Sequence, residues 1–538
     1  MVNYSRQLQT NKSVKITGGE FLVNLLINEK VDTIFGYPGA PILPIYDALS
    51  KTTEIKHILT RHEQGAIHAA EGYAKAKNKC GVVLVTSGPG VTNTITGIIN
   101  AYTDQTPVVI IAGMAETCDE NEFQDVNIEK LTKNHTKETF SLKNISDMEK
   151  VVKTAFSKAM TYPQGPCVIA VTKSVLNSAI EDKTEFKLKK DIKVEAPHSC
   201  VLKAIDTLQK ANKPLIIIGG GCKDADNEIR ELTQLTHIPV VNTLMATGIA
   251  DNISLGLIGT NGENELNNKI KNADIVLALG VRFSNRTTNN DTKFLQNSKI
   301  ISINISHNKS KNVSTTKEII GEMNIILQQI IGTIKSKNIL FDIHYDWIEQ
   351  LSNTNTNSIN NDNELTVQYV LNEIHNYTKK YRPIITTDVG EHQICCAKIF
   401  KTNSARNFLT SGGLGTMGFG LPAAIGAQIA RPNALVLNIT GDGSFQMNIQ
   451  ELATCSEYNL PIKIILLNNS SLGMIKTMQE KDYNNCYKSN LINPDFTKIS
   501  NAYGILGYNI KTKEDLKQAL KEIFTYKKAV LLNIQTNK

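Results

Sequence analysis

The segment VLNITGDGSFQMNIQELATCSEYNLPIKIILLNN, residues 436–469, contains two apolar runs that each end in polar residues. The first run leads directly into the turn GDGS (441–444), and a helical pattern follows over residues 445–458. The second run, 462–467, ends at the pair Asn468-Asn469. This order predicts a strand, a tight turn, a helix, a second strand and a loop. An open parallel sheet binds its ligands at the carboxyl ends of such strands.

Asp442 and Asn469 therefore stand at the ends of two strands of one predicted sheet. A carboxylate and an amide oxygen, together with a loop carbonyl, form a hard oxygen set that suits Mg²⁺ holding a diphosphate. Gly441 and Gly443 allow a sharp turn and a close approach of the backbone to a ligand. An Asp-Gly turn alone is common in proteins, so the metal interpretation depends on the asparagine that follows one strand later.

The chain of 538 residues is too long for one ordinary domain, and we expect three. Apolar runs alternate with helical patterns throughout, which predicts an α/β fold of three doubly wound parallel-sheet domains. The predicted domains are residues 12–176, 197–340 and 364–538. The charged segment 174–198 and the polar segment 353–363 separate them as predicted linkers.

Within these domains the apolar runs define the buried strands, and the amphipathic runs define the helices. In the first domain we predict strands at 34–36, 81–86, 107–113 and 166–171, and helices at 63–77 and 93–102. In the second domain we predict strands at 214–221, 239–244, 275–280 and 300–305.

The composition argues against several classes of function. A net charge of +7 is small for this length and is scattered along the chain, so we expect no nucleic-acid partner. The nine cysteines show no metal-ligand spacing, and Cys395-Cys396 lie in an apolar stretch as expected of buried thiols. Residues 1–15 contain no apolar signal core and no run is long enough to span a bilayer, so we expect no membrane partner and a cytoplasmic location.

Five motifs resemble the large subunit family of acetolactate synthase, a group of thiamine diphosphate enzymes. They are FGYPGAPILPIYDAL (35–49), RHEQGA (61–66), VVLVTSGPGVTN (82–93), GLGTMGFGLPAAIGAQ (413–428) and GDGSFQMNIQELAT (441–454). The resemblance covers nearly the whole chain and implies the three-domain fold of these enzymes.

The resemblance implies a carboligase that decarboxylates pyruvate on thiamine diphosphate and transfers the two-carbon unit to a second 2-keto acid. The product would be 2-acetolactate, in branched-chain amino acid biosynthesis. Three alternatives stay open: another acceptor such as the keto group of a nucleotide-linked sugar, simple decarboxylation of a 2-keto acid, or a weakly catalytic regulatory paralogue. A homodimer or homotetramer is implied, and a regulatory small subunit is left open.

The same resemblance implies roles for individual residues. Glu63 would contact N1′ of the cofactor's aminopyrimidine and favour the imino tautomer that removes the C2 proton. Asp442, Asn469 and the carbonyl of Ser471 would bind Mg²⁺. The diphosphate and the rest of the cofactor would lie against Gly390, Glu391, His392, Gly441, Gly443, Ser444, Met417, Met447 and Met474. Substrate would meet Phe123 and Gln124, with Lys173 and Arg286 as cations at the entrance.

The central domain of this family binds FAD, which does no redox work in the reaction. The pattern is kept at Gly220, Thr243, Leu244, Met245 and Arg282. The family's histidine before Gly262 is replaced by Asn261, and its acidic residues near a strand end are replaced by Asn304 and Ser306. We expect FAD at this domain, although glycine-rich strand ends are also common structural turns.

Other differences from the family surround the place where the second substrate lands. The family usually has glycine and alanine at the positions of Ala40 and Pro41. It usually has proline at the position of Glu116. Cys395 and Met478 replace tryptophans, and Glu391 replaces a glutamine on the diphosphate side. Glu63, Asp442 and Asn469 are intact, so the cofactor chemistry is kept and these differences bear on the identity of the acceptor.

Overall fold

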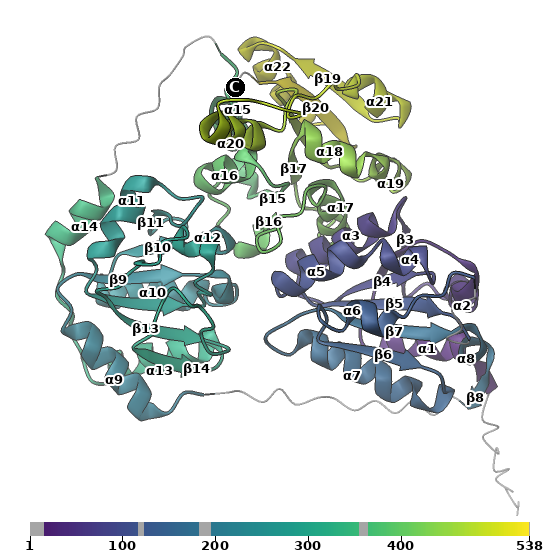
Figure 1. The fold of residues 1–538 in the computed structure, drawn as a ribbon, viewed down its shortest axis with the longest axis horizontal. Coiled ribbons are helices and arrows are strands. Elements are labelled where there is room, and N and C mark those ends of the chain that lie inside the picture. The colour runs from purple at the N-terminus through teal and green to yellow at the C-terminus, as the bar shows by residue number, and fades with distance from the viewer. Residues whose placement is uncertain (1–14, 117–122, 182–194, 354–363, 537–538) are drawn as a thin grey trace, which may run out of the picture. The chain divides into compact units, whose positions relative to one another are not determined.

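Three parallel six-stranded sheets, each flanked by helices, form the framework of the protein (Figure 1). The computed structural model describes residues 15–116, 123–181, 195–353 and 364–536. The chain divides into two compact units, the first made of residues 1–70 and 80–190 and the second of 71–79 and 191–538. The first unit contains one of the three sheets and the second unit contains the other two. The predicted fold class is confirmed.

The sheet of the first unit has the strand order β3-β2-β4-β5-β7-β6, with every neighbouring pair parallel. Its central strands are buried along their whole length because helices cover both faces, as their continuous apolar runs predict. The strands are β2 (Thr33–Gly36), β3 (Lys56–Leu59), β4 (Gly81–Val85), β5 (Val108–Met114), β6 (Glu138–Leu142) and β7 (Cys167–Thr172).

The last sheet of the second unit has the order β16-β15-β17-β18-β20-β19. Counted along the chain, this is the same order as in the first unit's sheet, 2-1-3-4-6-5, although no sequence repeat is visible. The strands are β15 (Ile384–Thr387), β16 (Phe408–Thr410), β17 (Val436–Gly441), β18 (Lys463–Asn468), β19 (Leu506–Ile510) and β20 (Val530–Gln535). The predicted pair of parallel strands around the GDGS turn is confirmed as β17 and β18.

The central sheet has a different order, β11-β10-β9-β12-β13-β14, which is 3-2-1-4-5-6 along the chain. That order is typical of dinucleotide-binding domains. The strands are β9 (Pro214–Ile218), β10 (Val240–Asn242), β11 (Ser254–Leu257), β12 (Ile275–Leu279), β13 (Lys299–Asn304) and β14 (Lys317–Ile320). The second unit contains two separate sheets, so we propose that it comprises two domains. The proposed domains of the chain are then residues 12–176, 197–340 and 364–538.

Helices cover both faces of each sheet. In the first unit they are α1 (Gly18–Asn28), α2 (Leu43–Ser50), α3 (Glu63–Lys77), α4 (Pro89–Thr92), α5 (Ile95–Thr103), α6 (Ile128–Thr132), α7 (Met148–Met160) and α8 (Lys173–Asn177). Around the central sheet they are α9 (His198–Gln209), α10 (Asp226–Thr236), α11 (Asn264–Lys269), α12 (Asn285–Thr288), α13 (Met323–Ser336) and α14 (Tyr345–Ser352). Around the last sheet they are α15 (Val367–Thr378), α16 (Glu391–Ile399), α17 (Gly420–Ala430), α18 (Asp442–Met447), α19 (Leu452–Glu457), α20 (Gly473–Tyr483), α21 (Phe496–Ala502) and α22 (Lys513–Ile523).

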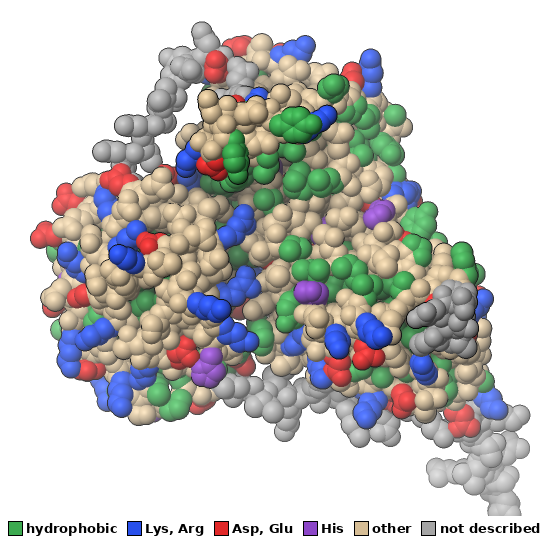
Figure 2. Space-filling view, in the orientation of Figure 1, with side chains coloured by type: hydrophobic (Ala, Val, Ile, Leu, Met, Phe, Trp, Pro, Cys, Tyr) green, Lys and Arg blue, Asp and Glu red, His purple; other side chains and the backbone are tan. Residues whose placement is uncertain are grey.

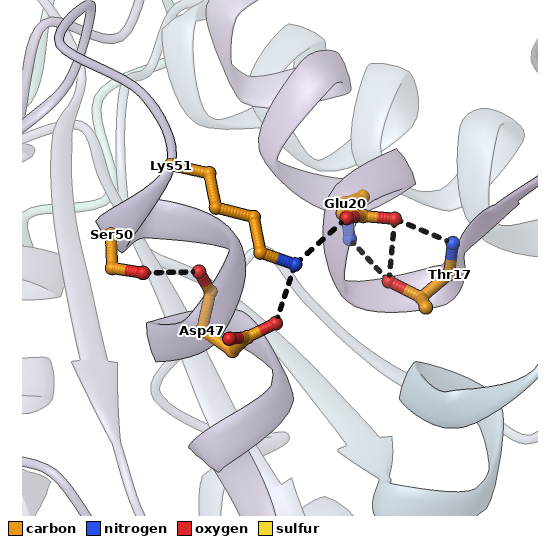
Figure 3. A network of polar contacts seen from close by, with 5 residues as sticks. All are labelled: Thr17, Glu20, Asp47, Ser50 and Lys51. Atoms are coloured by element: carbon orange, nitrogen blue, oxygen red, sulfur yellow. Dashed lines mark hydrogen bonds and ion pairs between the residues drawn. The ribbon is translucent and has the colours of Figure 1, made fainter.

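The start of α1 shows how local sequence fixes a helix end (Figure 3). The Thr17 hydroxyl accepts a hydrogen bond from the Glu20 backbone N–H, and the Glu20 carboxylate accepts one from the Thr17 backbone N–H. This capping box satisfies two donors that a helix end leaves open. Lys51 then bridges Glu20 at 3.0 Å and Asp47 at 2.8 Å, which connects α1 to α2.

The helix predicted at 445–458 is wrong as a single element. The structure has two helices there, α18 and α19, which are separated by a break at Asn448. The Asn448 side chain donates to the Gly418 carbonyl at 2.7 Å, and this tertiary bond holds its backbone out of helical geometry. The first helix also begins earlier than predicted, at Asp442 itself.

The predicted linker 174–198 contains ordered structure at both ends. Its first residues continue α8 and then form β8 (Ala179–Glu181), which pairs antiparallel with β1 (Lys15–Thr17), and α9 begins at His198. Residues 182–194 of this linker, nearly all of the linker at 353–363 and nearly all of the N-terminal segment 1–15 lie outside the described residues. In the apolar stretch around α16, Cys396 is fully buried and Cys395 is partly buried, and both are free thiols.

Candidate active site

Polar residues of the last sheet meet where the strand order reverses. The first strand of this sheet, β15, lies between β16 and β17, so the switch point is between the ends of β15 and β17. β15 is followed by Asp388 and Gly390, and β17 ends at Gly441 next to Asp442. Asn469 follows β18, the neighbour of β17 on its other side. The fold therefore brings the predicted metal and diphosphate residues to one edge of one sheet.

Asp442 is only 2% exposed and is the first residue of α18. Burial raises the pKa of its carboxyl group, and a hydrogen bond from Asn493 acts in the opposite direction. Asn493 Nδ2 lies 2.6 Å from Asp442 Oδ2. A buried carboxylate needs compensation by hydrogen bonds or a cation. Its chemistry therefore fits the role of a metal ligand.

The loop after β18 presents the other two predicted ligands. Asn469 Oδ1 accepts a hydrogen bond from the Ser471 backbone N–H at 3.1 Å, which fixes the orientation of the amide. The Ser471 hydroxyl is buried and has no hydrogen-bond partner. Oxygen atoms of an amide, a carboxylate and a carbonyl suit Mg²⁺ rather than a softer metal. Among the described residues, no group of three or more His, Cys, Asp and Glu side chains is placed to hold a metal.

The His392 ring lies next to Gly390 and Gly441, and one of its nitrogen atoms has no hydrogen-bond partner. Its Nε2 atom is buried without a hydrogen-bond partner, and burial lowers the pKa of the imidazole to about 4. A side chain placed on Gly441 would lie 3.3 Å from the ring, and one on Gly390 would lie 2.8 Å from it. The bare backbone and the neutral imidazole thus leave room and a hydrogen-bonding atom for a phosphate oxygen. The acid Glu391 is exposed, whereas its neighbour His392 is buried.

The remaining predicted cofactor residues of this domain lie in α18, in the loop before α17 and at the start of α20. Ser444 is buried in α18, and Gly443 is partly buried beside the side chains of Leu472 and Met417. Met447, the last residue of α18, is 53% exposed, and Met417 and Met474 are partly buried.

Helix α20 follows the metal loop and has no buried residue. Its Ile475 and Met478 are about half exposed, and Tyr483 is 78% exposed. Figure 2 shows hydrophobic side chains on the face of the molecule that carries α18 and α20. These side chains give α20 a partly exposed apolar surface.

Glu63 is the first residue of α3, where a carboxylate is favoured by the helix dipole. It is partly exposed, and Asn93 Nδ2 donates to its Oε2 atom at 3.0 Å. A side chain placed on Gly90 would lie 3.7 Å from the other carboxylate oxygen, so the glycine leaves that oxygen uncovered by a neighbouring side chain. The structure thus fixes one oxygen of Glu63 and leaves space beside the second.

Gln124 lies against the turn after β4. Its backbone has a φ of +59°, and a side chain on Gly88 would lie only 2.8 Å from its carbonyl oxygen. Gly88 itself has a φ of +56°, so glycine is favoured there both by conformation and by space. The neighbouring Phe123 is 86% exposed.

Lys173 is exposed at the first position of α8. The next residue, Ser174, donates from its backbone N–H to Glu116 Oε1 at 2.7 Å and from its hydroxyl to Glu116 Oε2 at 2.6 Å. Glu116 therefore places a negative charge beside the predicted cation. Pro41, another difference from the family, lies close to Gly113 near the end of β5.

Arg286 is in α12, and its guanidinium donates to the Gly412 carbonyl at 3.2 Å. Gly412 precedes the loop that carries Met417. Arg286 is therefore held next to a predicted cofactor-lining segment within the second unit.

The central sheet reverses its order between β9 and β12, and a glycine directly follows each of these strands, Gly219 after β9 and Gly280 after β12. A side chain on Gly219 would lie 2.3 Å from the Gly280 carbonyl oxygen, so the two strand ends require glycine for their close approach. Near them the predicted FAD residues are placed as follows: Gly220 lies next to Met245, Thr243 and Leu244 are buried, and Arg282 is exposed. Asn304, which replaces an expected acid, donates to the Val281 carbonyl and accepts from the Ile305 N–H.

Sequence reasoning missed three residues, of which two hydrogen-bond candidate site residues and the third directly follows β15. Asn93 hydrogen-bonds Glu63, and Asn493 hydrogen-bonds Asp442. Asp388 is buried and accepts hydrogen bonds from the Thr440 hydroxyl and from the Gly420 N–H. Asn93 ends one of the quoted motifs, and Asp388 directly follows a strand, so both had a visible signal.

Three family models match this chain in the order of its sheets. They are the thiamine pyrophosphate enzyme N-terminal TPP binding domain at residues 16–142, the central domain at 201–330 and the C-terminal TPP binding domain at 388–534. The fold and these matches define a thiamine pyrophosphate enzyme.

Relatives of known name match almost the whole chain. The acetolactate synthase large subunit of Haemophilus influenzae is 36% identical over 97% of this chain and 95% of its own length. That of Buchnera aphidicola subsp. Schlechtendalia chinensis is 41% identical over 94% and 92%. The mitochondrial acetolactate synthase catalytic subunit of Saccharomyces cerevisiae is 34% identical over 98% of this chain and 81% of its own. The chain belongs to the acetolactate synthase large-subunit family. Among its described residues, no helix is long and apolar enough to cross a membrane.

Proposed function

We propose that this protein decarboxylates pyruvate on thiamine diphosphate and transfers the two-carbon unit to a second 2-keto acid, forming 2-acetolactate. The observation that carries the proposal is the match to acetolactate synthase large and catalytic subunits over almost the whole chain. The position of the candidate ligand residues at strand ends agrees with it. The relatives named acetolactate synthase favour this reaction over a nucleotide-sugar acceptor or simple decarboxylation. We therefore propose the self-condensation of pyruvate as the main activity.

Asp442, Asn469 and the Ser471 carbonyl would hold Mg²⁺, and the metal would neutralise the diphosphate charge. His392 supports this assignment because its buried Nε2 atom has no partner within the protein. The bare backbone of Gly390 and Gly441 beside the ring supports it as well. When bound, thiamine diphosphate would supply an electron sink for the electron pair that remains on the former carbonyl carbon when CO₂ leaves.

Glu63 would hold or exchange a proton at the aminopyrimidine ring of the cofactor. Asn93 supports this role because it fixes one carboxylate oxygen at 3.0 Å and so orients the second. The helix dipole also favours a carboxylate at this helix start.

Phe123 and Gln124 would lie beside the reacting centre, and Lys173 and Arg286 would each act as a cation that attracts the 2-keto acid. The nearby carboxylate of Glu116 reduces the positive potential at Lys173, because opposite charges close together cancel at a distance. We therefore propose that Arg286, which is anchored to the Gly412 carbonyl, has the larger role in attracting substrate.

The central domain would bind FAD at the ends of β9 and β12. Its strand order and the close approach of Gly219 to Gly280 support a dinucleotide. Gly220, Thr243, Leu244, Met245 and Arg282 would surround it. Flavin fluorescence released on denaturation of the purified protein would show whether FAD is bound.

We further propose a homodimer as the active assembly, with a homotetramer as the larger possibility, in the cytoplasm. The relatives named large subunits support a regulatory small subunit as an additional partner. Branched-chain amino acid biosynthesis is the corresponding pathway.

Product analysis with pyruvate as the sole substrate tests the activity. We expect CO₂ and 2-acetolactate in equal amounts, each dependent on thiamine diphosphate and Mg²⁺. CO₂ with acetaldehyde and no acetolactate would contradict the proposal and favour simple decarboxylation.

A further inference from the structure

Asn493 joins the two strand ends that carry the candidate metal ligands. It ends the return segment, defined as Ser489–Asn493, which brings the chain back from α20 to the metal loop. Asn493 Nδ2 donates to Asp442 Oδ2 at 2.6 Å and to Asn468 Oδ1 at 3.0 Å. Its Oδ1 atom accepts from Gln446 Nε2 at 3.0 Å. One amide group therefore contacts both α18 and the end of β18.

These contacts allow only one orientation of the Asn493 amide. Its oxygen faces a donor, the Gln446 NH₂ group, whereas its nitrogen faces two acceptor oxygens. Rotating the amide by half a turn would place oxygen against the Asp442 carboxylate and lose all three bonds. The Asn493 NH₂ group is thus directed at the candidate metal ligand by its surroundings.

A chain of side-chain hydrogen bonds, here called the amide ladder, runs from Asn468 across the sheet to Asp495. In each of its first three hydrogen bonds an asparagine side-chain nitrogen donates to the side-chain oxygen of the next residue, so the asparagine amides all point the same way. Asn468 Nδ2 donates to Asn533 Oδ1 at 3.0 Å, Asn533 Nδ2 to Asn509 Oδ1 at 2.8 Å, and Asn509 Nδ2 to Thr497 Oγ1 at 3.1 Å. Thr497 Oγ1 donates to Asp495 Oδ1 at 2.6 Å. Because Asn493 donates to Asn468 and the ladder ends at Asp495, both of its ends meet the loop 493–495.

The backbone of the return segment also braces the metal loop. The Leu472 N–H donates to the Ser489 carbonyl at 2.8 Å, and the Leu491 N–H donates to the Ser470 carbonyl at 2.8 Å. Ser471, whose carbonyl is a proposed ligand, lies between these two bonds. The return segment is therefore held to the metal loop on one side and to Asp442 on the other.

We propose that Asn493 is a positioning residue for the Mg²⁺ site, held in place by the amide ladder. This inference rests on the proposed thiamine diphosphate function. A carboxylate oxygen that accepts one hydrogen bond keeps a second lone pair for a cation. Fixing Asp442 Oδ2 therefore sets the plane of the carboxylate before the metal arrives, as partners of metal ligands commonly do.

The test is calorimetric titration of Mg²⁺ into the full-length metal-free protein at saturating thiamine diphosphate. Asn493→Ala should weaken Mg²⁺ binding by about 10–100-fold, the usual effect of losing such a partner. Asn490→Ala is the matched control, because Asn490 is in the same segment but its side chain faces Lys476. It should bind Mg²⁺ as the unmodified protein does and should keep the unmodified thermal unfolding midpoint.

Gln446→Ala provides a second variant because Gln446 is exposed and its loss should not affect folding. It should weaken Mg²⁺ binding in the same direction by a smaller factor. If Asn493→Ala fails to fold, Gln446→Ala decides: normal Mg²⁺ affinity would overturn the proposal. Asp442→Ala separates the two hypotheses. Loss of binding in that variant with normal affinity in Asn493→Ala would overturn the role of Asn493 alone, whereas an unmodified protein that binds no Mg²⁺ would overturn the proposed function as well.

Discussion

Glu63 and Asp442 are both carboxylates near the ends of parallel strands, but their surroundings differ. Asp442 is almost fully buried, and the pKa of its carboxyl group is raised by that burial. Glu63 is partly exposed at a helix start and accepts one hydrogen bond from Asn93. The first environment suits a group that meets a fixed cation, and the second suits a group that exchanges a proton.

Glu63→Gln tests the second role. The variant keeps the size and the acceptor oxygen of the side chain, so we expect folding and thiamine diphosphate binding to persist. Exchange of the cofactor's C2 proton and CO₂ release should each slow by at least ~10²-fold, the scale of a lost acid–base contribution. Proton exchange followed by NMR measures the first of these rates directly. An unchanged exchange rate would remove Glu63 from this role.

The environment of His57 predicts that the free energy of unfolding depends on pH. Its ring accepts or donates a hydrogen bond with the Tyr46 hydroxyl at 2.9 Å, and burial lowers the pKa of His57 from 6.5 to about 4. The unfolded chain therefore binds a proton at higher pH than the folded chain does. The contribution to stability is complete above about pH 6.5 and is lost as pH falls toward 4.

His57→Gln should accordingly reduce the acid-side loss of stability between pH 6.5 and 4. The maximum slope from one such group is about 1.4 kcal/mol per pH unit. Urea unfolding of the first unit's transition at several pH values measures it. The same slope in the variant and in the unmodified protein would contradict a buried neutral imidazole at this position.

At the scale of elements, helix ends are fixed by local contacts and their breaks by distant ones. The Thr17 capping box was fixed by residues three apart, whereas the break at Asn448 depends on the Gly418 carbonyl thirty positions away. A local sequence pattern shows which residues can cap a helix. It does not show which distant backbone group will bond to a residue within the helix. The helix over 445–458 was therefore predicted as continuous.

Thr17→Ala should destabilise α1 by about 0.5–2 kcal/mol, because the Glu20 N–H loses its acceptor. Thr17→Ser keeps the hydroxyl and serves as the control. Denaturant unfolding followed by circular dichroism gives both values. Equal stability of the alanine and serine variants would show that the cap does not contribute.

The candidate site could be predicted from sequence wherever a ligand directly follows a strand. Asp442, Asn469 and Glu63 all do so, or follow after a short turn, and a parallel sheet brings such positions to one edge. Asn493 could not be predicted, because the exposed excursion through α20 separates it from the strand ends that it contacts. The strand orders were also invisible, since apolar runs specify strands but not their neighbours.

At the scale of the whole molecule, the proposed assembly explains the exposed apolar surface of α18 and α20. We expect the active protein to sediment as a dimer or a tetramer, with two thiamine diphosphate molecules for each pair of chains. Met478→Glu, a charge on the half-exposed face of α20, should weaken association without affecting the fold of the monomer. Analytical ultracentrifugation with an activity assay checks this, and a fully active monomer would contradict it.

The first and last sheets have the same strand order, 2-1-3-4-6-5, yet they share no sequence motif. Because the order is the same, the third and fourth strands are neighbours in both sheets, and the turns that follow them occupy equivalent positions. In the first sheet, the turns after the third and fourth strands carry Ser87 and Glu116, in place of Asp442 and Asn469 in the last. One sheet topology thus presents two different sets of side chains at equivalent strand ends, so the chemistry of a strand end depends on its turn residues and not on the order of the strands.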